Sequence, residues 1–185
     1  MHVVDDAEVW SIDRTTGRSH RLDDGRHAFC FDPAVAPDGS TVSWVGWSPP
    51  SMPWDAAERV DARLVAGEVV EISVSRPEGA SVQQARFTAD GTPTSVHDAG
   101  GWLNVVVGDR VVAPEPVEHA GPTWGMGQRS YAPMPDGSVV VTRNVGGFGT
   151  LSVVDAGGRR RDLDPGFVGV HESSCHRSRV PQISS

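Results

Sequence analysis

In Ala36-Pro37-Asp38-Gly39 a short apolar stretch ends in an Asp-Gly pair, and the same pattern returns in Thr88-Ala89-Asp90-Gly91 and in Met134-Pro135-Asp136-Gly137. The first two aspartates are 52 residues apart, and the second and third are 46 apart. Asp suits the opening position of a tight turn and Gly supplies its positive φ, so each pair can join two antiparallel strands. A period of about 40 to 50 residues with one such turn per unit is typical of β-propeller blades.

The pattern predicts an all-β chain, namely an incomplete β-propeller of about three to four four-stranded antiparallel blades. The 21 glycines and 14 prolines support this, because they interrupt helical patterns but suit short strands joined by turns. One half blade comes first, with its inner strands expected before Met1, and three full units follow. The expected strands are 8–12 and 19–22, then 33–36, 41–47, 62–65 and 69–74, then 84–87, 94–97, 103–107 and 110–113, and finally 130–133, 138–143, 150–154 and 159–163.

The core and the domain boundaries follow from the same pattern. Alternating apolar side chains make 42–47, 105–107 and 139–141 the expected core strands. The partial propeller is expected to cover residues 1–167, and residues 168–185 to form an irregular, disordered tail without strand or helix periodicity. An incomplete ring leaves its end blades without a neighbour, so apolar faces would be exposed. We therefore expect the chain to self-associate or to be marginally stable.

Charge and residue usage exclude several classes of function. The formal net charge is −8 and no basic stripe is present, so neither nucleic acid nor a membrane is an expected partner. All 16 basic residues are Arg, which excludes chemistry that depends on Lys, such as a P-loop or a Schiff base. Two distant cysteines without a CxxC pair, no signal-peptide pattern and no long apolar run indicate a cytoplasmic protein.

The segment Ser48-Pro49-Pro50-Ser51-Met52-Pro53-Trp54-Asp55 interrupts the strand pattern. It has too many prolines for a strand and too many apolar side chains for a linker, so we expect an ordered loop packed by Trp54 and Met52. Most of the six tryptophans lie beside expected strands: Trp10, Trp44, Trp47, Trp102 and Trp124. These side chains could form a stacking surface for sugars or bases, but packing between blades is the favoured interpretation.

Two segments carry a more specific pattern. Met52-Pro53-Trp54-Asp55 follows the strand Val42-Ser43-Trp44-Val45-Gly46-Trp47, and Pro122-Thr123-Trp124-Gly125-Met126-Gly127-Gln128-Arg129-Ser130-Tyr131 comes later. Together with 33–39, 98–104 and 151–155, these segments resemble the propeller of bacterial prolyl oligopeptidase family serine peptidases, of the dipeptidyl aminopeptidase or acylaminoacyl-peptidase type. The resemblance covers roughly residues 8 to 163.

The resemblance implies one part of a two-part enzyme, whose propeller caps an α/β-hydrolase domain and admits short peptides to a Ser-Asp-His triad. No Gly-x-Ser-x-Gly pentapeptide, the mark of the nucleophile in such a domain, occurs in this sequence. No catalytic residue, cofactor or metal ligand is therefore assigned. The chain is interpreted as a non-catalytic fragment that gates and selects short peptide substrates for an α/β-hydrolase domain missing from this chain. The expected partners are a peptide or protein ligand, and either a hydrolase domain in trans or a second copy of the chain. The alternative is a stand-alone scaffold that binds a peptide or protein and dimerises to complete its ring.

A few residues invite a chemical role but lack the surroundings for one. Soft metal ligands and a carboxylate lie together in the expected tail: His171, Glu172, Cys175 and His176. Their spacing fits no common zinc module, and His27 with Cys30 is a weaker pair still. Cys30 could act as a nucleophile only beside a positioned base. No base or oxyanion hole is indicated, so a buried structural thiol is the favoured interpretation.

Two further groups of residues recur or stand out. Asp38, Asp90 and Asp136 occupy equivalent positions in their units, which favours turn capping over chemistry. Three polar side chains are candidates for lining a central channel: His97, His119 and Arg129. The sequence does not settle which of them faces it.

A fluorophosphonate probe is predicted to label no serine of this chain, and short aminoacyl and acyl-peptide amides are predicted to stay intact. Serine-dependent acyl transfer needs a nucleophile, a base within hydrogen-bond reach and an oxyanion hole, and the sequence offers no such set. Mass spectrometry of the protein and chromatography of the amides measure the two outcomes. Stoichiometric labelling of one serine, or turnover that disappears when that serine is replaced, would contradict the prediction.

Overall fold

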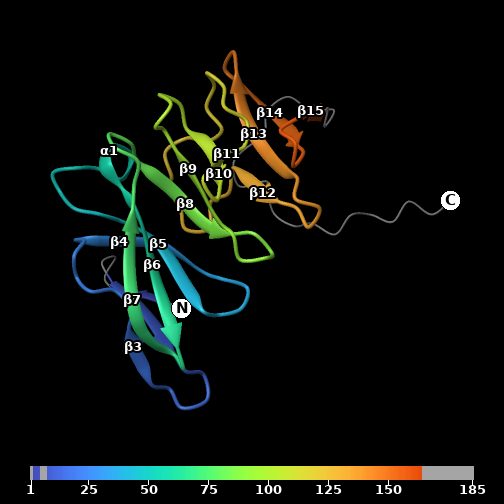
Figure 1. Cartoon of the computed structure of the whole chain (residues 1–185). Helices are drawn as coiled ribbons and strands as arrows, with labels where there is room; N and C mark the ends of the chain where they lie inside the picture. The colour runs from blue at the N-terminus through green and yellow to red at the C-terminus, as the bar shows by residue number, and fades with distance from the viewer. Residues whose placement is uncertain (1, 5–7, 164–185) are drawn as a thin grey trace.

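Four antiparallel sheets follow one another along the chain in the computed structural model, which describes residues 2–4 and 8–163 (Figure 1). The first sheet has three strands: β1 (His2–Val4), β2 (Glu8–Ile12) and β3 (Ser19–Arg21). The second contains β4 (Phe29–Val35), β5 (Thr41–Trp47), β6 (Glu58–Val65) and β7 (Glu68–Ser75). The third contains β8 (Val82–Phe87), β9 (Pro93–His97), β10 (Asn104–Val107) and β11 (Arg110–Val111). The fourth contains β12 (Tyr131–Pro133), β13 (Val139–Val145), β14 (Phe148–Val154) and β15 (Arg160–Leu163).

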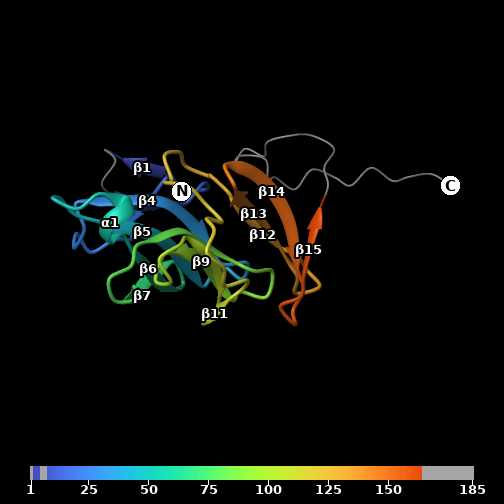
Figure 2. The same ribbon diagram turned by 90° about the horizontal axis from the view of Figure 1, so that it is seen from above.

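Within each sheet every strand pairs with the next one in sequence, so each sheet is a simple antiparallel meander. Seen from above, the second, third and fourth sheets succeed one another side by side (Figure 2). Burial is lowest in the last strand of the second, third and fourth sheets. Residues 82–86 of β8 are all buried, whereas β7 alternates between exposed and half-buried and β15 is mostly exposed. The nearly all-β, propeller-like architecture predicted from the sequence is therefore confirmed.

The three Asp-Gly turns have the predicted geometry. Gly39, Gly91 and Gly137 have φ of 74°, 87° and 80°, the left-handed region that glycine adopts without strain. Each preceding aspartate accepts hydrogen bonds from the residue two positions on, as in Ser40 N to Asp38 Oδ1 at 2.9 Å. These hydrogen bonds also lower the pKa of the three exposed carboxyls. The repeated aspartates therefore cap turns.

The expected core strands are buried, but not all in the expected way. Residues 42–46 of β5 are buried without interruption rather than in alternation, because both faces of this strand are covered by protein. Val42 and Trp44 pack with the first sheet in one core cluster. Val105, Val139 and Val141 join the third and fourth sheets in another. Strand β5 is therefore covered by protein on both faces instead of facing solvent on one side.

The first strands of the second and third sheets share a bulge that the periodicity does not reveal. Pairing of β4 with β5 shifts register between Phe31 and Ala34, and pairing of β8 with β9 shifts between Gln83 and Arg86. Asp32 and Gln84, inside these shifts, have φ of 54° and 52°. A bulge re-aims side chains at the point where it occurs. Here it directs polar groups of one sheet toward the next.

Hydrogen bonds cross between sheets at these bulges. The Arg86 guanidinium pairs with the Asp32 carboxylate and also donates from Nη1 to the Asp32 carbonyl at 3.0 Å. On the other side, the Tyr131 hydroxyl donates to the Gln84 carbonyl at 2.7 Å and lies 2.9 Å from Thr94 Oγ1. Buried polar groups cost free energy unless they are paired, so these bonds fix how the three sheets sit against each other.

Several expected boundaries need correction. The inner strands of the first sheet were expected before Met1. One further strand, β1, lies within the chain and pairs with β2. Strand β4 begins at Phe29 instead of residue 33, because its bulge allows pairing on both sides of Pro33. Strand β6 begins at Glu58 instead of residue 62. The proline-rich segment is ordered as expected but contains a helical turn, α1 (Pro53–Ala56).

Two further expectations concern the tail of the chain and the absence of a membrane-spanning helix. The expected tail, 168–185, with its metal-ligand candidates, lies outside the described residues. The described helix, α1, is a turn of four residues, and nothing helical in the described ranges is long and apolar enough to cross a membrane.

Replacing Tyr131 with Phe is predicted to destabilise the fold by about 1–3 kcal/mol, because the Gln84 carbonyl and the Thr94 hydroxyl would lose a buried partner. Urea unfolding followed by circular dichroism measures the change. The Tyr131→Phe/Thr94→Val double variant is the control. Since the two side chains bond to each other, its loss should be smaller than the two single losses together. An unchanged midpoint for Tyr131→Phe would contradict this role.

Candidate functional site

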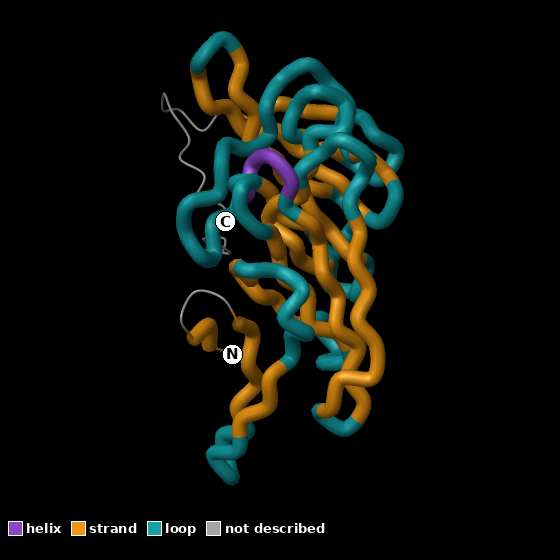
Figure 3. Tube along the Cα trace, turned by 90° about the vertical axis from the view of Figure 1, so that its left-hand side faces the viewer, coloured by secondary structure: helices purple, strands orange, loops and turns teal. Residues whose placement is uncertain are grey.

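Two connecting segments meet at one end of the sheets, 48–57 between β5 and β6 and 121–130 before β12. Figure 3 shows helix α1 of the first segment among the loops at this end. Both segments belong to the most specific part of the sequence pattern described above. Their contacts decide what kind of site this end can form.

The first segment is held by a short network of hydrogen bonds. Met52 N donates to Asp55 Oδ2 at 2.9 Å, which closes the start of α1. Ser81 Oγ donates to the Pro53 carbonyl at 2.6 Å and accepts from Ala57 N at 3.2 Å. Ser81 immediately precedes β8, so the segment is fastened to the third sheet. Trp54 is thereby fixed on a well-supported loop, whereas Met52, expected to pack, is exposed.

The second segment is anchored on two sheets. Thr123 donates from N and Oγ1 to Gln83 Oε1 at 3.0 and 2.8 Å. Gly127 N donates to Asp32 Oδ1 at 2.9 Å, which ties the segment to the bulge of β4. Between these anchors, Trp124 N donates to Gln128 Oε1 at 3.1 Å. The side chains that the segment presents are therefore positioned by bonds at both ends.

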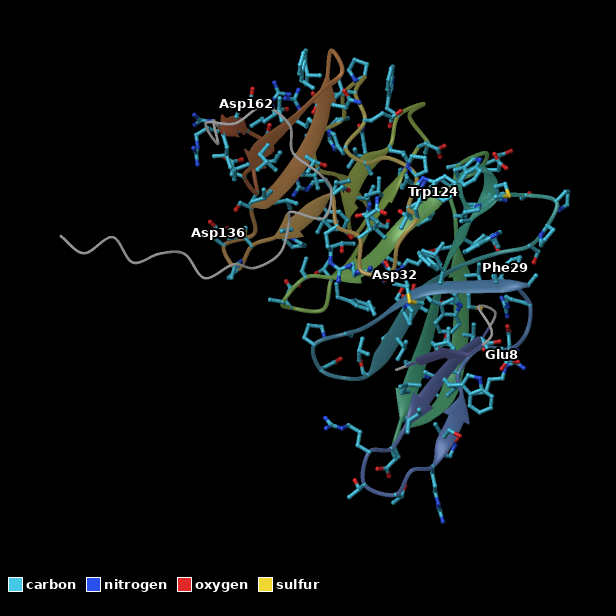
Figure 4. All side chains as sticks on the ribbon, turned by 180° about the vertical axis from the view of Figure 1, so that it is seen from behind. Glu8, Phe29, Asp32, Trp124, Asp136 and Asp162 are labelled. Atoms are coloured by element: carbon cyan, nitrogen blue, oxygen red, sulfur yellow. The ribbon has the colours of Figure 1, made fainter. Side chains whose placement is uncertain are left out.

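An apolar pocket with a cavity volume of about 670 Å³ lies between the two segments, and we call it the aromatic pocket. Its residues are Phe29, Cys30, Phe31, Trp47, Pro49, Pro50, Ser51, Met52, Pro53, Trp54, Thr123, Trp124 and Met126. Trp54 and Trp124 contact each other with ring centroids 5.0 Å apart and ring planes tilted by 55°, and Phe29 stacks on Trp47 at 5.3 Å. Trp124, which is labelled in Figure 4, is 73 % exposed, so it forms an open wall of the pocket. Open aromatic surface of this kind makes the pocket a candidate binding site.

Two other cavities in the described part of the chain are polar grooves. One, of about 630 Å³, is lined by Arg59, Asp61, Arg76 and His97 among others. The second, of about 510 Å³, lies beside Glu118, His119 and Arg143. Their charged groups are largely committed to partners within the protein. Arg59, for example, pairs with Asp61 at 2.8 Å. The aromatic pocket is the better candidate because its apolar walls have no such partner.

Cys30 does not have the surroundings of a nucleophile. It is 2 % exposed, and burial, with a contribution from the Asp23 carboxylate, raises the pKa of its thiol to about 12. A thiol with such a pKa is protonated near neutral pH and is a poor nucleophile. His27 lies with its Nε2 2.9 Å from Glu58 Oε2. The structure thus agrees with a structural thiol.

The three candidates for a channel lining are not brought together. His119 is 1 % exposed and lies between the third and fourth sheets, so it lines no open channel. His97 is half-buried on β9 in the first polar groove. Arg129 is half-buried at the inner edge of the sheets, close enough to Arg86 and Asp32 for their charges to affect its pKa. Of the three, Arg129 alone lies on the segment that forms the aromatic pocket.

His119 is part of a buried charged cluster. Its Nε2 donates to Glu115 Oε1 at 2.9 Å, since its Nδ1 accepts from Val105 N at 3.3 Å. Burial lowers the pKa of His119 in spite of the nearby carboxylate. Burial alone would raise the pKa of Glu115, but hydrogen bonds from Arg143 and His119 outweigh it and bring that pKa to about 2. The cluster therefore holds a neutral imidazole on an ionised carboxylate and supports the loop that precedes residue 121.

Trp47, Trp54 and Trp124 line the pocket, whereas Trp44 is buried in the core, so the tryptophans serve both packing and an open surface. No group of three or more His, Cys, Asp or Glu side chains within residues 2–4 and 8–163 is placed to hold a metal. Sequence reasoning missed the polar partners of the site, Asp32, Gln83 and Gln84. The signal available was spacing, because Asp32 and Gln84 each lie six residues before the aspartate of an Asp-Gly turn.

No protein-family model matches the sequence, and no curated protein matches it. Solved structures do. Puromycin hydrolase matches with 24 % identity and a TM-score of 0.75 over 86 % of this chain and 25 % of its own. A serine-to-alanine mutant of puromycin hydrolase complexed with PGG matches with 26 % identity and a TM-score of 0.75 over 87 % of this chain and 25 % of its own. A puromycin-hydrolyzing peptidase of Mycobacterium tuberculosis matches with 26 % identity and a TM-score of 0.75 over 85 % of this chain and 25 % of its own.

These neighbours are prolyl oligopeptidase family peptidases, and this chain is structurally similar to their propeller part. The similarity was implied by the sequence pattern and is confirmed at the level of the fold. The chain spans about a quarter of the length of these neighbours.

The free energy of unfolding is predicted to fall as the pH drops below 6.5, the ordinary pKa of histidine, because the unfolded chain then takes up a proton that buried His119 resists. Below pH 4.5 the ionised Glu115 adds a further loss that continues toward pH 2. Urea unfolding between pH 7.5 and 5.5 measures the slope.

The His119→Gln variant should have a shallower slope over that interval, because Gln does not titrate. Ser19→Gln, at an exposed position of β3, is the matched control and should leave the slope as it is, because it changes no titratable group. An identical slope for wild type and His119→Gln would show that His119 is not the titrating group.

Proposed function

We propose that this chain is the propeller part of a prolyl-oligopeptidase-like serine peptidase, in which its sheets are the blades of an incomplete propeller. Its role is to gate and select short peptide substrates for an α/β-hydrolase domain. The observation that carries the proposal is the aromatic pocket, which is built by the two segments with the most family-like sequence. The similarity of the fold to the propeller part of puromycin hydrolase supports it.

The pocket has the properties that a peptide side chain requires. Its volume, about 670 Å³, lies within the usual range for small-ligand sites, about 300–1,000 Å³. An apolar or aromatic side chain of a peptide would gain binding free energy by being buried between these aromatic walls. The hydrogen bonds that anchor Thr123 and Gly127 hold the walls in place before a ligand arrives, which limits the entropy lost on binding. The pocket therefore selects peptides by one bulky apolar side chain.

Catalysis in this proposal belongs to a hydrolase domain that acts on the selected peptide, either within a longer protein or in trans. The dipeptidyl aminopeptidase or acylaminoacyl-peptidase specificity and a cytoplasmic location are parts of the same proposal. Exposed apolar side chains on the first and last sheets, such as Ile12 and Phe148, favour covering by a neighbouring domain or by a second copy.

A stand-alone peptide-binding scaffold is the second candidate. It is favoured by the ordered aromatic pocket, whose walls are held by hydrogen bonds within this chain. The DNA downstream separates the two functions. A continuing reading frame with that motif after a buried strand supports the peptidase, and an unrelated gene supports the scaffold.

Titration with a phenylalanine-containing tetrapeptide is predicted to change the tryptophan fluorescence of the chain, because Trp54 and Trp124 lie at the site. A glycine-serine tetrapeptide of the same charge should bind far more weakly. Trp124→Ala should weaken binding of the phenylalanine peptide by about tenfold, the worth of one aromatic contact of about 1.4 kcal/mol. Trp102→Ala is the matched control, since Trp102 is 42 % exposed and lies outside the pocket. Equal affinity for both peptides would contradict the proposal.

A further inference from the structure

We propose that Arg129 binds a carboxylate of the peptide whose apolar side chain fills the aromatic pocket. This inference rests on the proposed function and adds the chemistry of the ligand's second anchor. Four observations about the charges, the unpaired donors and the path of the chain at the inner edge of the sheets carry it.

Arg129 differs from the other arginines in the described ranges by lacking a carboxylate partner while it is half-buried. Its guanidinium donates from Nη1 to the Gln128 carbonyl at a long 3.5 Å. Eight arginines of the described ranges form ion pairs: Arg21, Arg26, Arg59, Arg63, Arg76, Arg86, Arg143 and Arg160. The remaining ones are all exposed to water: Arg14, Arg18, Arg110, Arg159 and Arg161. A charge that is withdrawn from water without a partner costs free energy, which a binding anion would recover.

The Asp32 carboxylate, whose charge acts on Arg129, is already bonded to other groups. Asp32 accepts from Arg86 through Oδ2 and from Gly127 N through Oδ1. Arg86 and Arg129 thus place two positive charges around one negative charge, in a chain whose net charge is −8. Burial, followed by repulsion from Arg86, lowers the pKa of Arg129. One positive charge is therefore unmatched at this place, which fits a ligand group with a single negative charge.

The same place has unused donors. Arg86 Nε and Gln84 Nε2 are buried without an acceptor within the described ranges, and their residues are 6 % and 1 % exposed. Gln84 Oε1 accepts from Ser130 N, so this amide lies against the backbone next to Arg129. An environment with surplus donors favours a group that only accepts. An ionised carboxylate is such a group, and it can accept two parallel hydrogen bonds from one guanidinium.

The path of the chain joins this charge to the aromatic pocket. Trp124 and Met126 line the pocket, Gly127 bonds to Asp32, and Arg129 follows two residues later. Five residues of chain span at most about 18 Å, even when fully extended. A peptide of about five residues or fewer can therefore place an apolar side chain in the pocket and a carboxylate on Arg129. The two anchors together select short peptides with a negative charge at a fixed distance from a bulky side chain.

The test compares three forms of one phenylalanine-containing tetrapeptide: a C-terminal acid, its C-terminal amide, and an amide with a glutamate in the last position. We expect wild type to bind the acid at least about tenfold more tightly than the amide, the worth of one charge-assisted hydrogen bond. If the carboxylate can come from a side chain, the glutamate amide should match the acid; if the C-terminus is required, it should bind like the plain amide. Raising the salt concentration should reduce the preference.

Variants assign the preference to Arg129. Arg129→Gln should lose it and Arg129→Lys should keep part of it, whereas Trp124→Ala should weaken acid and amide alike. Arg161→Gln, at an exposed arginine, is the matched control and should bind as wild type does. The thermal midpoint of Arg129→Gln should equal or exceed that of wild type, because an unmatched charge is removed; a purely structural role would lower it.

Equal binding of acid and amide by wild type would overturn the carboxylate site and leave the proposed peptide function intact, as would a preference that survives in Arg129→Gln. Failure of all three peptides to bind wild type would overturn the proposed function itself and this inference with it.

Discussion

The buried carboxylate of Asp32 is the interaction on which the arrangement of the second and third sheets and of the pocket depends. One oxygen pairs with Arg86 of the third sheet, and the other accepts Gly127 N from the segment before the fourth sheet. Removing one partner of such a buried pair is costly, typically about 3–5 kcal/mol, because the other charge is left without compensation. The bulge of β4 makes the contact available by giving Asp32 a positive φ and turning it out of the strand ladder. A local irregularity in one strand therefore sets the relation between three parts of the chain.

The sequence predicted what depends on local pattern. The turns at Asp38, Asp90 and Asp136 were predictable because an Asp-Gly pair strongly favours a tight turn. Strand β5 was placed from Thr41 to Trp47 because apolar residues dominate it. It did not predict what depends on distant partners. Residues 42–46 were expected to alternate, but burial between two sheets removes the need for a polar face. Strand β1 was missed because three residues carry too little periodicity to be recognised.

The candidate site was harder to foresee for the same reason. Trp54 and Trp124 stood out as members of family-like segments, yet nothing in the sequence states that residues 70 positions apart have ring centroids separated by 5.0 Å. Arg129 was singled out, but together with His97 and His119, which lie in other grooves or in the interior. What distinguishes Arg129 is that it is half-buried and forms no ion pair with a described carboxylate, and only the three-dimensional structure reveals that. The pocket and the charge beside it thus depend on packing between residues far apart in the sequence, whereas the turns depend on short local motifs.

The bond from Gly127 to Asp32 closes a loop of 95 residues, which bears on the order in which the molecule assembles. The meander of the second sheet needs only contacts between neighbouring strands, so it can form as soon as residues up to Ser75 are available. The far wall of the pocket must wait for 121–130. During synthesis at about 5–20 residues per second, Phe29, Phe31, Trp47 and Trp54 are therefore without that wall for several seconds. In that interval their apolar surface on that side stays exposed.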